Sequence, residues 1–126
     1  MITYNGTSLP EIGTVMPDGT IYCGISAHQK PLYAAPNDEG EMDWDDALKA
    51  AKESTACGHK DWRLPDLHEL DLLYTHREKI GGFSPRWYWS SSEFHHSTAT
   101  IQDFGYGLRH YFLKDWAGGL VRSVRG

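Results

Sequence analysis

The stretch GHKDWRLPDLHEL, residues 58–70, determines the fold prediction more than any other part of the sequence. Trp62 and Leu64 alternate with charged residues, so in an extended segment both apolar side chains point to one face. A proline then ends this segment, and Asp66 followed by Glu69 has the spacing of a helix capping box. The stretch therefore predicts an extended segment that turns directly into a helix.

The residues on either side predict an α+β domain. Before the stretch, residues 20–25 and 31–35 have the pattern of a β-hairpin, and the residues after Asp43 have helical spacing up to Gly58. The helix that starts at Asp66 should end at Gly81–Gly82. Four more strands are predicted at residues 87–90, 99–104, 109–114 and 120–125. Because helices and strands are segregated along the chain, an antiparallel α+β fold is favoured over a parallel βαβ sheet.

Composition limits both the size and the class of the protein. With 126 residues, of which 40% are hydrophobic, the chain has enough apolar material for one core. We expect residues 1–12 to be loosely ordered and residues 13–126 to form a single domain. The net charge of -5 argues against nucleic acid or an anionic membrane surface as partner.

The N-terminal residues and the cysteines suggest where the chain is found. The N-terminus has neither a basic start nor an apolar run, so we expect no secretion signal and a cytoplasmic or virion-associated protein. No apolar run approaches the roughly 20 residues needed to span a bilayer. In a reducing compartment Cys23 and Cys57 should be free thiols, although a disulfide between them stays open.

Several motifs in one order resemble the DUF1566 family, also called the Lcl C-terminal domain. They are a first helix with a tryptophan, the DWRLP stretch followed by Glu-Leu, then YWSS at 88–91, a Phe-x-x-Gly, a lysine and the terminal VRSVR at 121–125. The resemblance covers nearly the whole chain. It implies a C-type-lectin-like fold, with two helices packed against short, twisted antiparallel sheets and with long ordered loops. Many relatives have cysteine where Ser123 stands here, which puts an inherited disulfide in doubt.

Most signature residues are predicted to be structural. We expect Trp62, Leu64, Trp87 and Trp89 to fill the core, as large apolar side chains at alternating positions usually do. Arg63 should form an ion pair, with Glu69 or Asp61 as its partner. In the terminal VRSVR the arginines are expected on one side of a strand and the valines on the other.

The sequence supports neither a metal site nor a known catalytic motif. The seven histidines lack the spacing of zinc ligands, and the sugar-binding motifs of calcium-dependent lectins are absent. The related formylglycine-generating enzymes use a cysteine pair near the C-terminus, whereas both cysteines here lie in the first half of the chain. We therefore predict no metal and no cofactor, and keep an enzyme of that type as the weaker alternative.

The segment 93–116 has the composition of a recognition surface. Aromatic residues, histidines and an arginine alternate there with serine and glycine, a mixture that gives rigid contact area at low entropy cost. By resemblance to diversified receptor-binding relatives, the predicted ligand-binding residues are Phe94, His95, His96, Tyr106, Arg109, His110, Tyr111 and Trp116. About half of them could instead fill the core, and Phe104 and Phe112 are the first core candidates.

These observations favour a non-catalytic module that binds a protein or a glycan through this C-terminal face. The resemblance implies an association with phages or mobile elements. An intracellular inhibitor that binds a host protein through the same face is the main alternative. The face could equally be an interface between copies of the chain.

Overall fold

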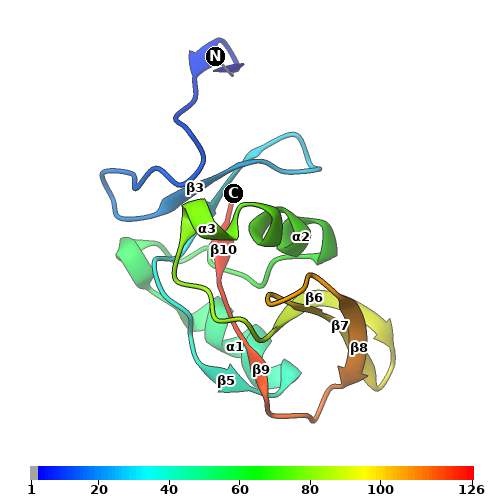
Figure 1. The fold of residues 1–126 in the computed structure, drawn as a ribbon. Coiled ribbons are helices and arrows are strands. Elements are labelled where there is room, and N and C mark those ends of the chain that lie inside the picture. Colours follow the sequence, from blue (N-terminus) through cyan, green and yellow to red (C-terminus); the bar gives the residue numbers. More distant parts are fainter. Residues whose placement is uncertain (1–2) are drawn as a thin grey trace.

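The computed structural model describes residues 3–126, which form helices and curled sheets, so the α+β prediction is confirmed (Figure 1). Two of the three sheets are small. They are β1 (Thr3–Tyr4) with β2 (Thr7–Ser8), and, in spatial order, β10 (Val124–Arg125), β4 (Pro31–Ala34) and β3 (Ile21–Ile25). The large sheet has the order β5 (Glu41–Met42), β9 (Gly119–Leu120), β6 (Trp87–His95), β7 (Thr98–Asp103) and β8 (Arg109–Leu113). The narrower expectation of a C-type-lectin-like fold stays a prediction.

The helices begin where the capping residues predicted. The Asp43 side chain accepts a hydrogen bond from the Asp46 backbone N–H at the start of α1 (Trp44–Glu53), which a 3₁₀ turn at Ala56–Gly58 follows. Asp66 and Glu69 form the complete capping box of α2 (Leu67–Thr75). One prediction is wrong here, because the helix does not continue to Gly81. It breaks at His76, which leaves the helical region (φ -110°, ψ 21°), and α3 (Arg77–Ile80) follows as a separate turn.

The strands differ from the prediction in two ways. The first is that β6 continues to His95, with register shifts after Trp89, and pairs in parallel with β9, so the large sheet is mixed. The second is that residues 120–125 are not one strand. The chain crosses between β9 and β10, from the large sheet to the three-stranded one, and its arginines do not share a side. Their spacing of three residues places Arg122 in the interior and Arg125 at the surface.

The core lies on both sides of β6, whose adjacent rings point in opposite directions. Tyr88 belongs to a cluster with α2, β3 and β4, which includes Phe104. Trp89 belongs to a second cluster with α1, which includes Leu64 and Val121. Trp62, Leu64, Trp89 and Phe104 are buried as predicted, whereas Trp87 and Phe112 are half-buried.

The N-terminal segment stands apart from this core. Figure 1 shows the β1–β2 hairpin projecting beyond β3 and joined to it by an extended stretch. The backbone of Thr14 and Val15 then lies along the edge of β3, pairing with Tyr22 and Ile21. Among the helices that the structure describes, none combines the length and apolar character needed to cross a membrane.

Candidate functional site

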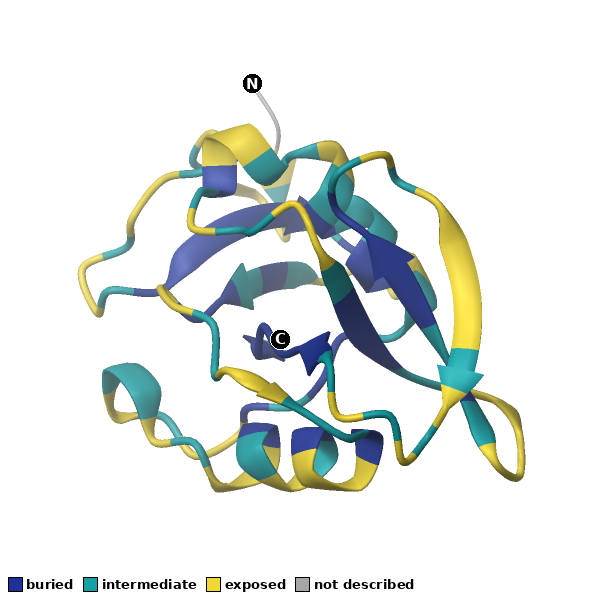
Figure 2. Ribbon diagram, turned by 60° about the horizontal axis from the view of Figure 1, so that its bottom comes forward, coloured by how far each residue is buried: buried dark blue, intermediate teal, exposed yellow. Residues whose placement is uncertain are grey.

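The aromatic segment predicted to bind ligands forms the exposed edge of the large sheet. Within the part of the chain that the structure describes, strand β8 is the last strand of this sheet and pairs with β7 alone, from Gln102 opposite Arg109 to Thr98 opposite Leu113. Four of its five residues are exposed, whereas four of the six residues of β7 beside it are buried (Figure 2). The sheet therefore holds a row of large side chains in fixed positions at the surface.

One face of this edge carries a stacked aromatic pair. The rings of Phe94 on β6 and Tyr111 on β8 are parallel within 1° and their centroids are 4.0 Å apart. Phe94 is 57% exposed, Tyr111 48% and Leu113, two residues further along β8, 58%. Since alternate residues of a strand share a face, Tyr111 and Leu113 lie side by side. Phe94, Tyr111 and Leu113 together are called the aromatic face below.

The opposite face of β8 continues into the core. Phe112 lies 5.4 Å from Trp87 and 4.6 Å from Trp116 between ring centroids, and Trp116 in turn contacts Trp89. His110 lies against Trp87 at the rim of this cluster. Trp116 is therefore half-buried and packs against the core, whereas the other seven predicted binding residues are exposed.

The structure does not bring all eight predicted residues together. His95 and His96 lie at the β6–β7 turn, with ring centroids 4.2 Å apart, near the end of β8. Tyr106, 84% exposed, lies in the β7–β8 turn at the opposite end of that strand. Arg109 begins β8 and forms an ion pair of 3.3 Å with Asp71 on α2.

Beside the aromatic face is a shallow apolar hollow of about 430 Å³. It is lined by Thr98, Tyr111, Phe112, Leu113 and Trp116. The Thr98 hydroxyl is buried and has no hydrogen-bond partner among the described residues. A buried polar group usually has a partner, so this hydroxyl is suited to bind a polar group that enters the hollow.

Leu108 and Leu113 are exposed apolar residues that the sequence interpretation did not include. The signal for Leu113 was present, because it alternates with Tyr111 in a predicted strand. Leu108 follows Gly107 in a turn, where no alternation pattern predicts the direction of the side chain.

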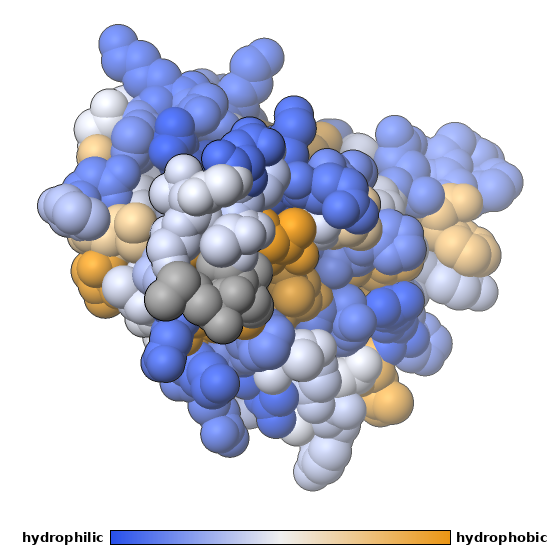
Figure 3. All heavy atoms as spheres, turned by 90° about the horizontal axis from the view of Figure 1, so that it is seen from above, coloured by the Kyte–Doolittle hydropathy of each residue, from blue (hydrophilic) through white to orange (hydrophobic). Residues whose placement is uncertain are grey.

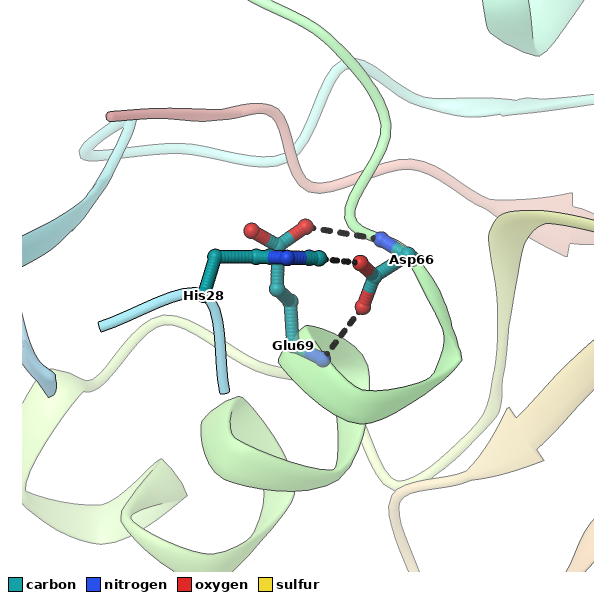
Figure 4. Close-up of side chains that lie close together, drawn as sticks. All are labelled: His28, Asp66 and Glu69. Carbon is teal, nitrogen blue, oxygen red and sulfur yellow. Dashed lines mark hydrogen bonds and ion pairs between the residues drawn. The ribbon is translucent and has the colours of Figure 1, made fainter. Parts of the chain in front are cut away.

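A second cluster joins a histidine and two carboxylates at the start of α2 (Figure 4). The ligand atoms of His28, Asp66 and Glu69 lie within 4.8 Å of one another, which is close enough to consider a metal ion. Each is already used: His28 lies 2.7 Å from Asp66, Asp66 caps the helix, and Glu69 accepts the Asp66 N–H.

The charge of this cluster is also balanced. Glu69 is buried and accepts two hydrogen bonds from Arg63, at 2.6 and 2.8 Å, which confirms the predicted ion pair. Burial raises the pKa of Asp66, but the hydrogen bonds from His28 and from the Glu69 N–H outweigh it and lower the pKa overall. The arrangement is a structural lock on α2. Sequence analysis missed His28 because it lies 38 residues before Asp66.

A larger hollow, of about 840 Å³, lies between the N-terminal segment and β3. Its apolar lining includes Leu9, Ile12, Tyr22 and Ile25. Figure 3 shows this face of the molecule as mostly hydrophilic, with an orange patch beside the N-terminal segment. None of the residues predicted to bind ligands lines this hollow.

The two arginines near the C-terminus hold separate segments of the fold together. The Arg122 side chain is fully buried and donates to the carbonyls of Ala35 and Gly81 at 2.6 and 3.0 Å, with Asp38 3.4 Å away. It also lies over the Phe83 ring at 4.4 Å. Arg125 forms two hydrogen bonds with Asp61, at 2.7 and 2.9 Å, which ties the last strand to the DWRLP stretch.

These contacts join the same motifs that suggested a family, and comparison with known families agrees. Residues 24–125 match the family described as the Lcl C-terminal domain. The chain belongs to this family. No curated protein matches the chain.

In this Lcl C-terminal domain the signature residues are mainly structural. Trp62, Leu64 and Trp89 are core, and Arg63, Arg122 and Arg125 hold separate segments together. Cys23 and Cys57 are free thiols, as expected. Burial raises the pKa of Cys23 to about 12, which keeps it protonated and unreactive near neutral pH. The exposed aromatic residues of β8 are not needed for any of these contacts.

Proposed function

We propose that this Lcl C-terminal domain is a non-catalytic binding module that recognises a protein or a glycan through the aromatic face. The observation that carries the proposal is the stacked pair of Phe94 and Tyr111, which lies exposed at the edge of the large sheet. Apolar residues gathered at the surface of a soluble protein mark interaction sites more often than chance.

The physical properties of the face suit recognition. Rings that are already fixed in one orientation lose little conformational entropy when a ligand binds. The apolar hollow next to them offers the Thr98 hydroxyl as a single polar contact, and Arg109 and His110 supply donors at the start of β8. A few anchors surrounded by polar groups are typical of interface hot spots.

The chemistry of the cysteines supports binding rather than catalysis. The pKa of the Cys23 thiol is raised by burial, so it is a poor nucleophile, and it lies in the core cluster of α2, β3 and β4, away from the aromatic face. The same aromatic face would serve an external receptor or an intracellular target, and the experiment below distinguishes protein from glycan in either case.

The test is capture of a ligand by the immobilised domain from host lysate and envelope fractions. We expect a Phe94→Ala, Leu113→Ala double variant to lose at least about tenfold in affinity for the captured ligand, because two exposed residues of the aromatic face are truncated. Val15→Ala is the matched control, since Val15 is equally exposed but lies in the bridge to β3, outside β6, β7 and β8.

Treatment of the fractions identifies the class of ligand. Protease digestion should abolish capture of a protein ligand, and periodate oxidation should abolish capture of a glycan. Unchanged affinity of the double variant for the captured ligand would contradict the proposal, as would no capture by the wild-type domain.

A further inference from the structure

We propose that two copies of this chain associate edge to edge through β8, in antiparallel register with a two-fold axis at Tyr111. The large sheets of the two copies would thereby become one continuous sheet. This inference goes beyond the proposed function and does not depend on it, because it concerns the backbone edge of β8 rather than a foreign ligand.

The hydrogen bonds between β7 and β8 show which backbone groups point away from the sheet. The Lys114 N–H donates to the Ser97 carbonyl at 2.9 Å, and the Asp103 N–H donates to the Leu108 carbonyl at 2.8 Å. Antiparallel pairs alternate between hydrogen-bonded and non-hydrogen-bonded, so the even-numbered residues of β8 bond to β7. The backbone groups of Arg109, Tyr111 and Leu113 therefore point outward.

Most of these outward groups form an edge that no other described segment covers. Among the described residues, the one partner recorded for them is the Trp116 N–H, which donates to the Leu113 carbonyl. Natural proteins usually protect an edge strand with a proline, a bulge or a lysine in its centre. Strand β8 reads Arg-His-Tyr-Phe-Leu, and its register with β7 is unbroken.

A second copy of β8 fits this edge because the outward groups are symmetric about Tyr111. In an antiparallel pair centred there, Arg109 of one copy lies opposite Leu113 of the other, and Tyr111 lies opposite itself. These residues then form hydrogen-bonded pairs, in which the Leu113 carbonyl accepts a second hydrogen bond beside the one from the Trp116 N–H. Each copy supplies the same surface, as a two-fold interface requires. An extended polypeptide satisfies such groups, whereas a glycan offers no matching repeat of N–H and carbonyl groups.

The side chains of the two copies are also complementary. Leu108 is exposed and is two residues before His110, so it belongs to the same face as Phe112. The antiparallel register brings Leu108 of one copy toward the end of β8 in the other, where Phe112 and Trp116 line the apolar hollow. An exposed apolar residue and an apolar hollow thus lie at positions related by the two-fold axis.

Charge favours the same orientation. The start of β8 carries Arg109 and His110, and the exposed Asp115 follows its end. Lys114 does not oppose the pairing, because its amino group is bound to Glu93 at 2.7 Å and lies over the Trp44 ring. Antiparallel pairing therefore places the basic start of each strand next to the acidic end of the other.

The first test is the mass of the purified chain by sedimentation equilibrium over a range of concentrations. We expect wild-type protein to associate to twice its mass of 14.3 kDa. Tyr111→Pro removes the outward N–H without removing a bond to β7, and should weaken the dimer by roughly tenfold or more. Tyr111→Val removes the same ring, keeps the N–H, and should weaken it much less.

The second test fixes the register and does not rely on a proline. Tyr111→Cys in a Cys57→Ser background should form an intermolecular disulfide under mild oxidation, because the two positions 111 meet at the axis. Lys49→Cys on the outer side of α1 is the matched control and should stay reduced at the same protein concentration.

Three results would overturn the proposal. They are a wild-type chain that stays monomeric at all concentrations, a folded Tyr111→Pro variant that dimerises as well as Tyr111→Val, and equal cross-linking of Tyr111→Cys and Lys49→Cys. A monomer that still captures a ligand would leave the proposed function intact, and a dimer that captures none would contradict only that function.

Discussion

Arg122 and Arg109 show how the interior of this molecule differs from the exposed edge of its large sheet. Arg122, between β9 and β10, has a fully buried side chain and holds backbone carbonyls from two other segments. Arg109, at the start of β8, is 45% exposed and contacts one carboxylate at 3.3 Å. Arg122 therefore holds separate segments of the fold together. Arg109 lies at a sheet edge and contributes little to the stability of the fold.

This difference separates the signature residues of the family from the residues that we propose to bind a ligand. The DWRLP and VRSVR motifs contact each other through Asp61 and Arg125. Their other residues lie in the core or stabilise the start of α2. The aromatic face contributes little to those contacts. Changes in the first region should therefore cost stability, and changes in the second should cost association with partners.

The largest expected effect is the loss of the buried arginine. Arg122→Met should lower the free energy of unfolding by about 3–5 kcal/mol, because Asp38 and two carbonyls lose their buried partner. Urea denaturation followed by tryptophan fluorescence measures this. The matched variant Arg125→Met, three residues away, breaks a more exposed pair and should cost no more than about 1 kcal/mol.

Equal losses in these two variants would break the comparison. They would show that the terminal motif stabilises the domain through both arginines alike, and that burial of Arg122 is not what distinguishes them.

The next effect concerns the lock on α2. Asp66→Ala should cost about 2 kcal/mol at neutral pH, since it removes the helix cap and the pair with His28. Asp66→Asn keeps a capping oxygen and loses only the charge, so it should cost about half as much.

The pH dependence separates the two contributions. The pKa of Asp66 is lower in the folded chain than in the unfolded chain, so its charge stabilises the fold above the ordinary aspartate pKa of 3.8. That contribution is lost as the pH falls through the folded value. Thermal unfolding at pH 7 and at pH 3 should show the wild type approaching Asp66→Asn in acid, while Asp66→Ala stays below both. A constant gap between wild type and Asp66→Asn would contradict this account.

Local patterns in the sequence predicted the region around the family motifs well. The capping box, the hairpin, the Arg63–Glu69 pair and the burial of Trp62 and Leu64 all depend on residues close together in the chain. The family followed from the same motifs.

Contacts between distant segments set the limits of prediction. Nothing near Asp66 in the sequence indicates His28, and nothing near Arg122 indicates the carbonyls of Ala35 and Gly81. The parallel pairing of β6 with β9 and the crossing between two sheets at residues 121–123 likewise depend on packing of the whole chain. For the candidate site, alternation predicted an exposed face of β8, but not that Tyr106 lies at the end opposite to His95 and His96.

The smallest expected effect sharpens the comparison within a single turn. Tyr106→Ala should change the free energy of unfolding by no more than about 0.5 kcal/mol, because the ring is 84% exposed and its backbone N–H can still bond to Asp103. The neighbouring Gly107→Ala should cost more than about 1 kcal/mol, since Gly107 has φ +79° and an added Cβ would lie 2.5 Å from the Tyr74 ring. Thermal unfolding of both variants measures this. A loss at Tyr106 as large as at Gly107 would mean that the exposed ring supports the fold, and its role in binding would then need another basis.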